Sequence, residues 1–152
     1  MKKKSPIRFQ NQKAQGAWAE LVFLSRAAAL DFTISTPYGD NAPYDAVVEK
    51  KGKVALVQIK SVTVRNGSRF QIRTWMRRDE RPYRPDEADF YALYIVPLDL
   101  WYIVPVSYVA TTNLYLRPEG PPLNHIEQFR EAWHLLEKVG HHRRRPRTSK
   151  SR

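Results

Sequence analysis

The stretch YDAVVEKKGKVALVQIKS, Tyr44–Ser61, decides the fold of this chain. Val, Leu and Ile fill most of two runs separated by Lys51-Gly52, so the pattern predicts a β-hairpin with its turn at that dipeptide. Three polar residues interrupt the apolar pattern: Asp45 opens the first strand, and Gln58 and Lys60 lie in the second. Because alternate residues of a strand project to the same face, Gln58 and Lys60 share one face. An acid, an amide and an ammonium group in so apolar a hairpin need either solvent or partners.

Two interpretations of these polar residues are open. In the first, the second strand lies at a sheet edge, and Gln58 and Lys60 face water. In the second, Asp45, Gln58 and Lys60 converge at a sheet edge, together with Glu20 from the upstream run WAELVFL. Hard divalent cations such as Mg²⁺ take oxygen ligands, and a nearby lysine stabilises charge that develops on a phosphate. The second interpretation therefore points to hydrolysis of phosphodiester bonds.

The segments around the hairpin predict a single domain that combines helices with a mixed sheet, of the α/β (α+β) class. Residues 11–30 have the apolar spacing of a helix with Asn11 as N-cap, and Asp31–Ser35 is a short strand. Asn66-Gly67 marks a second tight turn. The other expected elements are a strand over 69–75, an Arg- and Pro-rich loop over 76–86, strands over 89–96 and 101–104, a short helix over 105–109, a loop over 111–124 and a helix over 124–139.

The most apolar segment, YALYIVPLDLWYIVPVSYVA, is about as long as a membrane span. Pro97, Asp99 and Pro105 interrupt it, and both halves alternate, so two strands joined by a Pro-Leu-Asp turn are the better interpretation and no membrane partner is expected. The basic start has no apolar core of a secretory signal, and the chain has no cysteine, which excludes disulfides and thiolate catalysis. We therefore expect a cytoplasmic protein.

Charge points to a polyanionic partner, because the chain of 152 residues has a formal net charge of +11. One cluster is the C-terminal run, so we expect a flexible basic arm over 1–9, a folded domain over 10–140 and a disordered basic tail over 141–152. The second cluster lies inside the expected domain. It consists of Arg65, Arg69, Arg73, Arg77, Arg78, Arg81 and Arg84. Arginine forms bidentate bonds to phosphates and guanine, which favours nucleic acid as the partner.

The spacing of the polar residues resembles the PD-(D/E)XK nuclease superfamily. Pro43-Tyr44-Asp45 is followed after twelve residues by Gln58-Ile59-Lys60, and Glu20 lies on the upstream helix. In detail the chain is similar to the homing endonucleases of this superfamily that are associated with group I introns, in which glutamine replaces the usual acid. The resemblance runs from about Gln12 to Val106, and it implies a restriction-endonuclease-like core.

Carried over by position, the resemblance implies that Asp45 is the primary metal-ligating carboxylate and Lys60 the catalytic lysine. Gln58 would supply a neutral side-chain oxygen to the metal, and the backbone carbonyl of Ile59 would join it. Glu20 would ligate the metal or position a water bound to it. Because glutamine carries no charge, this site should hold Mg²⁺ more weakly than one with an acid in that position.

The expected function is that of a Mg²⁺-dependent endonuclease that hydrolyses duplex DNA, of the homing type. One small domain has one active site, so cutting both strands requires at least a homodimer, and a homotetramer is equally open. The predicted DNA contacts are Arg65, Arg69, Arg73, Arg77, Arg78 and Ser61. Two alternatives remain: a Holliday-junction resolvase or repair nuclease of the same fold, and a basic nucleic-acid-binding protein without activity. Trp75, among these arginines, is either a core residue or a platform for a base.

Overall fold

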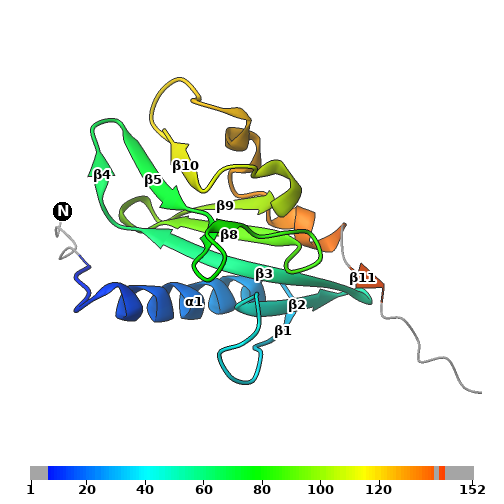
Figure 1. Ribbon diagram of the computed structural model, residues 1–152. Helices are drawn as coiled ribbons and strands as arrows, with labels where there is room; N and C mark the ends of the chain where they lie inside the picture. Colours follow the sequence, from blue (N-terminus) through cyan, green and yellow to red (C-terminus); the bar gives the residue numbers. More distant parts are fainter. Residues whose placement is uncertain (1–6, 139–140, 143–152) are drawn as a thin grey trace, which may run out of the picture.

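The predicted hairpin lies at the centre of a mixed sheet, and α1 packs along one side of it (Figure 1). The computed structural model describes residues 7–138 and 141–142. Most of the predicted basic tail, the first residues of the predicted arm and Gly140, the predicted helix end, lie outside the described residues. The helix and the strands of this sheet are α1 (Gln12–Ala29), β1 (Thr33–Ser35), β2 (Ala46–Lys50), β3 (Lys53–Val62), β8 (Phe90–Ile95), β9 (Leu100–Pro105) and β11 (His141–His142).

The strand order is β1-β2-β3-β8-β9, and β11 also pairs with β3. β2 and β3 are antiparallel, and Lys51 and Gly52 form their turn with φ of 51° and 75°. Glycine tolerates this left-handed conformation because it has no Cβ, which explains the Lys-Gly signal. β3 and β8 run parallel, whereas β8 and β9 are antiparallel. The sheet is therefore mixed, as predicted, but β3 is its central strand, and the expectation that Gln58 and Lys60 lie on an edge strand was wrong.

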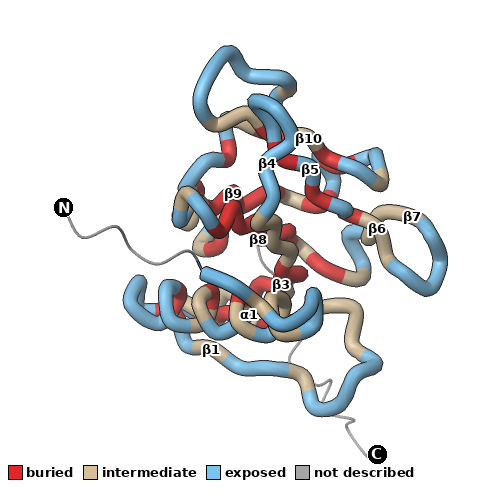
Figure 2. Tube along the Cα trace, turned by 90° about the vertical axis from the view of Figure 1, so that its left-hand side faces the viewer, coloured by how far each residue is buried: buried red, intermediate tan, exposed pale blue. Residues whose placement is uncertain are grey.

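Helix α1 begins where the sequence predicts. The side chain of Asn11 accepts a hydrogen bond of 2.9 Å from the Ala14 N–H, which satisfies a free donor of the first turn. Ala19, Phe23 and Ala27 are its buried residues, four apart, so one stripe of the helix faces the core. Figure 2 shows the buried part of the chain between α1 and the sheet and along β8 and β9.

A second sheet was not expected in full. The Asn66-Gly67 turn is confirmed between β4 (Arg65–Asn66) and β5 (Arg69–Arg73), but a third strand, β10 (Asn113–Leu116), pairs antiparallel with β5. The sequence interpretation of residues 111–124 as a loop was therefore wrong over β10. Leu114 and Leu116 pair with Ile72 and Phe70 and are buried with them, so β10 extends the apolar face of β5 through cross-strand contacts.

The Arg- and Pro-rich segment is also more ordered than predicted. β6 (Trp75–Met76) and β7 (Arg81–Pro82) form a short antiparallel pair around a turn in which Glu80 has a φ of 50°. The segment leads from β5 back to the start of β8, and it approaches β3 at Tyr83, whose ring centre lies 5.6 Å from Lys60 Nζ. It is therefore a folded loop next to the hairpin, which becomes important for the site.

The expected helix over 124–139 is absent. Two 3₁₀ helices, η3 (His125–Phe129) and η4 (Trp133–Glu137), replace it, although Asn124 caps the first one as predicted. The break lies at Glu131, where φ is 47°. Its backbone N–H donates to the Trp101 carbonyl at 2.8 Å, and its side chain accepts from the Trp101 N–H at 2.9 Å. These contacts with β9 hold the chain in a conformation that an α-helix does not allow.

Two further 3₁₀ helices, η1 (Val96–Leu98) and η2 (Val106–Tyr108), flank β9. The first forms the predicted Pro-Leu-Asp turn, and the second is the short helix expected over 105–109, in 3₁₀ form. The apolar segment from Tyr91 onward is thus two paired strands, as predicted. None of the helices in the described ranges, 7–138 and 141–142, is long and apolar enough to cross a membrane.

Candidate active site

The site forms where β2 separates from β3. β2 pairs with β3 from Lys53 to Val57, on one side of β3. On its other side β3 pairs with β8 from Val57 to Val62, so the side that β2 has left is open beyond Val57. Asp45 lies at the point of separation: its backbone N–H donates to the Val57 carbonyl at 2.9 Å, and its Oδ2 accepts from the Ile59 N–H at 2.8 Å. The carboxylate therefore takes the place of the next ladder bond and is held in a fixed orientation.

Gln58 and Lys60 project from one face of β3 at this separation. Ser61 and Thr63 on the other face contact Gln15 of α1, with Gln15 Nε2 donating to Ser61 Oγ at 3.1 Å. Gln58 is 6% exposed, and its side chain makes no hydrogen bond to any other residue that the structure describes. Its amide is not among the fully buried atoms that lack a partner, so it keeps some contact with the opening and its oxygen is accessible to a ligand.

Two charged groups, Glu20 and Lys60, interact electrostatically with Asp45. Burial raises the pKa of Asp45, while the Ile59 N–H and the Lys60 ammonium oppose this change. Burial also raises the pKa of Glu20 on α1, and the negative charge of Asp45 raises it further. The pKa of Lys60 is lowered by burial and partly restored by Asp45. Each group is thus close enough to Asp45 to feel its charge and is too desolvated to be a simple surface residue.

The predicted residues Glu20, Asp45, Gln58 and Lys60 are therefore brought to one region by α1, the start of β2 and the middle of β3. The expected position at a sheet edge needs one correction: Gln58 and Lys60 lie on the central strand. The opening exists only because β2 stops pairing after Val57.

Tyr83 is a residue of this site that the sequence analysis missed. The Lys60 Nζ lies 5.6 Å from the centre of the Tyr83 ring, and no acid of the described chain lies within ion-pair distance of Lys60. Burial raises the pKa of Tyr83 to about 12, with Asp45 and then Glu87 as further causes. The phenol therefore stays neutral and its ring face attracts the ammonium group. Its signal was hidden because Tyr83 lies in a segment that looked like an Arg- and Pro-rich loop.

Backbone contacts hold Tyr83 in place. Its N–H donates to the Tyr91 hydroxyl at 2.9 Å, and that hydroxyl donates to the Thr74 carbonyl at 2.7 Å. The two tyrosine rings also meet edge to face at 5.8 Å. Tyr91 is completely buried in β8, so the position of Tyr83 is fixed by the core.

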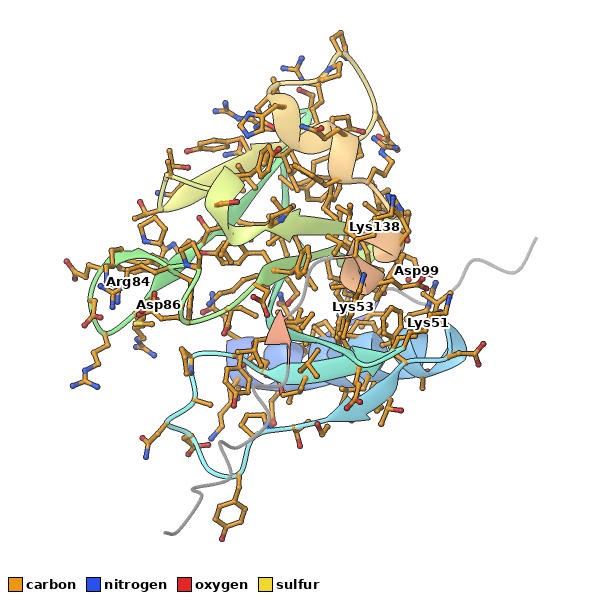
Figure 3. The ribbon with its side chains drawn as sticks, turned by 90° about the vertical axis from the view of Figure 1, so that its right-hand side faces the viewer. Lys51, Lys53, Arg84, Asp86, Asp99 and Lys138 are labelled. Carbon is orange, nitrogen blue, oxygen red and sulfur yellow. The ribbon has the colours of Figure 1, made fainter. Side chains whose placement is uncertain are left out.

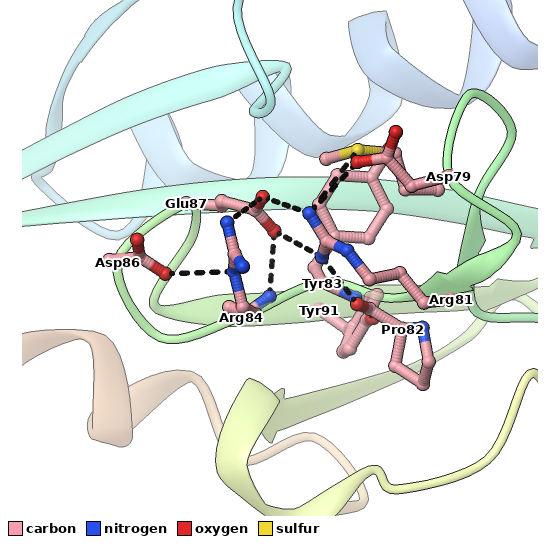
Figure 4. Close-up of polar contacts among 9 residues, drawn as sticks. Asp79, Arg81, Pro82, Tyr83, Arg84, Asp86, Glu87 and Tyr91 are labelled. Atoms are coloured by element: carbon pink, nitrogen blue, oxygen red, sulfur yellow. Dashed lines mark hydrogen bonds and ion pairs between the residues drawn. The ribbon is translucent and has the colours of Figure 1, made fainter.

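An ion-pair cluster organises the same loop (Figure 4). Arg81 forms a bidentate pair with Glu87, with Nη2 to Oε1 at 2.6 Å and Nη1 to Oε2 at 3.0 Å. Asp79 accepts from the same guanidinium at 3.0 Å, and the Arg84 N–H donates to Glu87 at 2.8 Å. These contacts lower the pKa of Glu87 to about 2, chiefly through the hydrogen bond from Arg81. Arg84 and Asp86 lie on this loop on the far side of the molecule from Lys51, Lys53 and Lys138 (Figure 3).

The predicted DNA contacts have different surroundings. Arg65 forms an ion pair with Glu119, and Ser61 bonds to Gln15 of α1. Arg69 lies over the Tyr115 ring at 4.6 Å, and Arg73 lies 5.9 Å from the Trp75 ring. Arg77 and Arg78 are exposed on the turn between β6 and β7. The carboxylates of Glu119, Glu87 and Asp86 form ion pairs with Arg65, Arg81 and Arg84 and offset part of the charge of the arginine cluster.

The donor set fits a hard divalent cation. Two carboxylates, Glu20 and Asp45, share the space with the unused amide oxygen of Gln58, and oxygen ligands of this kind suit Mg²⁺. In the described part of the chain, no group of three or more His, Cys, Asp or Glu side chains gathers to hold a metal.

Comparisons with known proteins agree with this geometry. A family profile described as PD-(D/E)XK endonuclease matches residues 10–136. A similar solved structure is that of a bacterial homing endonuclease, I-Ssp6803I, which is 25% identical with a TM-score of 0.73 and covers 86% of this chain and 94% of its own.

A weaker likeness is to Hjc, a Holliday junction resolvase from Archaeoglobus fulgidus. It is 15% identical with a TM-score of 0.47, and it covers 75% of this chain and 96% of its own. No curated protein matches the chain. Because the profile spans most of the sequence and includes both the opening of the hairpin and the loop of Tyr83, the chain belongs to the PD-(D/E)XK endonuclease family.

Proposed function

We propose that this endonuclease is a homing-type enzyme that uses Mg²⁺ to hydrolyse phosphodiester bonds in duplex DNA. The observation that carries the proposal is the convergence of Asp45, Glu20 and Lys60 at the separation of β2 from β3, with Gln58 beside them. The likeness to a bacterial homing endonuclease over most of both chains supports the subtype.

Four groups would hold the metal: the carboxylates of Asp45 and Glu20, the side-chain oxygen of Gln58 and the carbonyl of Ile59. When bound, Mg²⁺ would polarise the scissile phosphate and acidify the attacking water. The Ile59 N–H fixes one oxygen of Asp45, so the other oxygen remains available for a ligand. Gln58 cannot accept a proton as a base, which leaves it a positional role.

Lys60 would stabilise the charge that builds on the phosphate in the transition state. Its ammonium has no carboxylate within ion-pair distance among the described residues, so a phosphate oxygen would not have to displace one. The Tyr83 ring limits where the ammonium can lie, which favours one direction of approach.

DNA is proposed as the substrate because arginines of β5 and of the β6–β7 turn lie on the surface of the same domain. Arg69, Arg73, Arg77 and Arg78 remain the proposed phosphate or base contacts, together with Arg65 and Ser61 if their present partners release them. Cutting both strands needs two sites, so we propose a homodimer or homotetramer. Light scattering of the protein with and without duplex DNA tests this assembly.

Plasmid cleavage tests the activity directly. Supercoiled plasmid carrying candidate sites is incubated with the protein in Mg²⁺ and, separately, in EDTA. We expect cutting only with Mg²⁺, and a double-strand break at a single long site. Binding without any cutting would rule out the nuclease proposal, and cutting confined to four-way junctions would replace the homing assignment with a resolvase.

A further inference from the structure

The three-stranded sheet has one apolar face and one polar face. Phe70, Ile72, Leu114 and Leu116 are buried on the first. The alternate positions lie on the opposite face of β5 and β10, where side chains are exposed or half-buried. They are Arg69, Gln71, Arg73, Asn113 and Tyr115. Since β10 was expected to be a loop, the sequence alone did not place Asn113 and Tyr115 beside these arginines.

The arginines of this face differ from their neighbours in the cluster. Arg65, Arg81 and Arg84 each form an ion pair with a carboxylate. Within the part of the chain that the structure describes, Arg69 and Arg73 have aromatic rings as neighbours and no carboxylate at ion-pair distance. The polar face therefore keeps its positive charge, which suits a polyanion.

An amide pair joins the two strands here: Gln71 lies between the two arginines on β5, and Asn113 lies opposite Arg73 on β10. Gln71 Nε2 donates to Asn113 Oδ1 at 3.0 Å across the strands. Gln71 Oε1 and the Asn113 amide nitrogen make no hydrogen bond to a described residue, so the pair keeps an unused carbonyl oxygen as acceptor and an unused amide group as donor. Beside it lies a pocket of about 260 Å³ lined by Gln71, Arg73, Trp75, Thr112 and Asn113.

We propose that this face recognises sequence in the major groove of duplex DNA, with the Gln71–Asn113 pair selecting adenine; this inference rests on the proposed function. The major groove is about 12 Å wide and accepts a two-stranded ribbon. Adenine presents there an N7 acceptor and an N6 donor, which match the free donor and acceptor of the pair. Arg69 and Arg73 flank the pair along β5 and grip the backbone or an adjacent guanine.

The segment that follows β5 leads from this face to the proposed catalytic lysine. β5 ends at Arg73 and continues into β6, whose partner β7 is followed directly by Tyr83 at Lys60. The Thr74 carbonyl at that junction accepts from Tyr91, which also holds Tyr83. A base recognised by Gln71 would therefore lie at a fixed distance from the phosphate that is cut.

The test uses the full chain and a pool of duplexes with a randomised centre, selected in EDTA so that nothing is cut. Wild type is compared with Gln71→Ala/Asn113→Ala and Gln71→Glu. Gln128→Ala, another exposed amide with its own hydrogen bond to His125, is the matched control. Bound duplexes are sequenced, binding to the selected duplex is measured by fluorescence anisotropy, and Tm is recorded for each variant.

We expect an adenine preference at one position for wild type and Gln128→Ala. The double variant should lose that preference and bind the selected duplex roughly 10- to 100-fold more weakly, with unselected duplexes bound as before. Gln71→Glu should move the preference toward cytosine, whose N4 amine donates to a carboxylate, and a purely structural pair would not do this.

Three results would overturn the inference: no adenine preference in wild type, an unchanged preference in the double variant, or loss of binding to every duplex together with a lower Tm. Each of them leaves the proposed function standing if the plasmid is still cut with Mg²⁺. A wild-type protein that neither binds nor cuts duplex DNA overturns both.

Discussion

The two halves of β3 differ in what lies beside them. From Lys53 to Val57 the strand has β2 on one side, and Ala55 and Val57 are completely buried. From Gln58 to Val62 it has β8 on one side and, in place of β2, the Asp45 carboxylate at the Ile59 N–H. One strand thus contributes to the core in its first half and to the candidate site in its second. Gln58 and Lys60 come directly after Val57, the residue at which β2 stops pairing with β3.

The largest effect is expected from Lys60→Ala, compared with a lysine substitution in the other half of β3. Lys60→Ala should reduce plasmid cleavage roughly 100- to 1,000-fold, because a preorganised cation that meets developing charge is removed. Lys53→Ala, on the same strand but in the β2-paired half, should leave the rate within about twofold, as expected for a residue away from the reaction. Single-turnover cleavage with matched DNA binding measures both. Equal losses for the two variants would contradict a site confined to the second half.

Gln58→Glu sharpens the comparison at the metal. A carboxylate at position 58 adds a negative charge to the proposed ligand set. Half-maximal activity should therefore occur at a Mg²⁺ concentration lower by about an order of magnitude. Metal titrations of the cleavage rate for both proteins measure the shift. An unchanged titration would show that Gln58 does not face the metal.

Tyr83→Leu removes the ring that lies under Lys60. Cleavage should fall about 3- to 30-fold, the range for loss of a partly desolvated cation–π contact. Tyr83→Phe keeps the ring and should restore most of the rate, whereas a catalytic hydroxyl would make the two variants equally slow. DNA affinity measured in EDTA should stay near the wild-type value for both.

Asp45→Asn should stabilise the fold while it abolishes cleavage. The folded-state pKa of Asp45 lies above its ordinary value of 3.8, so folding favours the protonated carboxyl. The resulting contribution to the free energy of unfolding is present below pH 3.8, is lost as pH rises through the folded-state pKa, and is absent at pH 7. The amide should therefore raise the free energy of unfolding at pH 7 by about 0.5–2 kcal/mol in EDTA, as is common when a functional constraint is removed. The gain should vanish below the ordinary pKa.

Urea unfolding at both pH values provides the measurement. Val48→Ala, in the β2-paired half, is the opposite control: Val48 is completely buried, and its truncation should lower stability by about 1–3 kcal/mol. A loss of stability at pH 7 for Asp45→Asn would mean that the hydrogen bond to Ile59 outweighs the burial of charge.

Local signals account for the parts of the fold that the sequence predicted. The Lys-Gly turn, the Asn11 cap and the paired strands β8 and β9 each depend on a short stretch of sequence, and all are confirmed, although β8 is buried along its whole length and does not alternate. Gln58 and Lys60 were visible for the same reason, because a strand of known period carried two polar residues on one face.

The missed features depend on contacts between distant segments. β10 forms by pairing Leu114 and Leu116 with Ile72 and Phe70 of the distant β5. The helix expected at 124–139 breaks because Glu131 bonds to Trp101 on β9. Tyr83 reaches Lys60 through a hydrogen bond to Tyr91 that no local pattern encodes. Propensity was overridden by tertiary packing in each case.

The bidentate Arg81–Glu87 pair also limits how strongly ionic strength should affect this surface. Each DNA phosphate that a protein neutralises contributes about −0.9 to the slope of log K against log salt through counterion release. Of the seven arginines in the cluster, Arg65, Arg81 and Arg84 already have carboxylate partners. Binding of the cluster to DNA should therefore release the counterions expected for its four other arginines. The net charge of the sequence would predict a steeper salt dependence than this cluster provides.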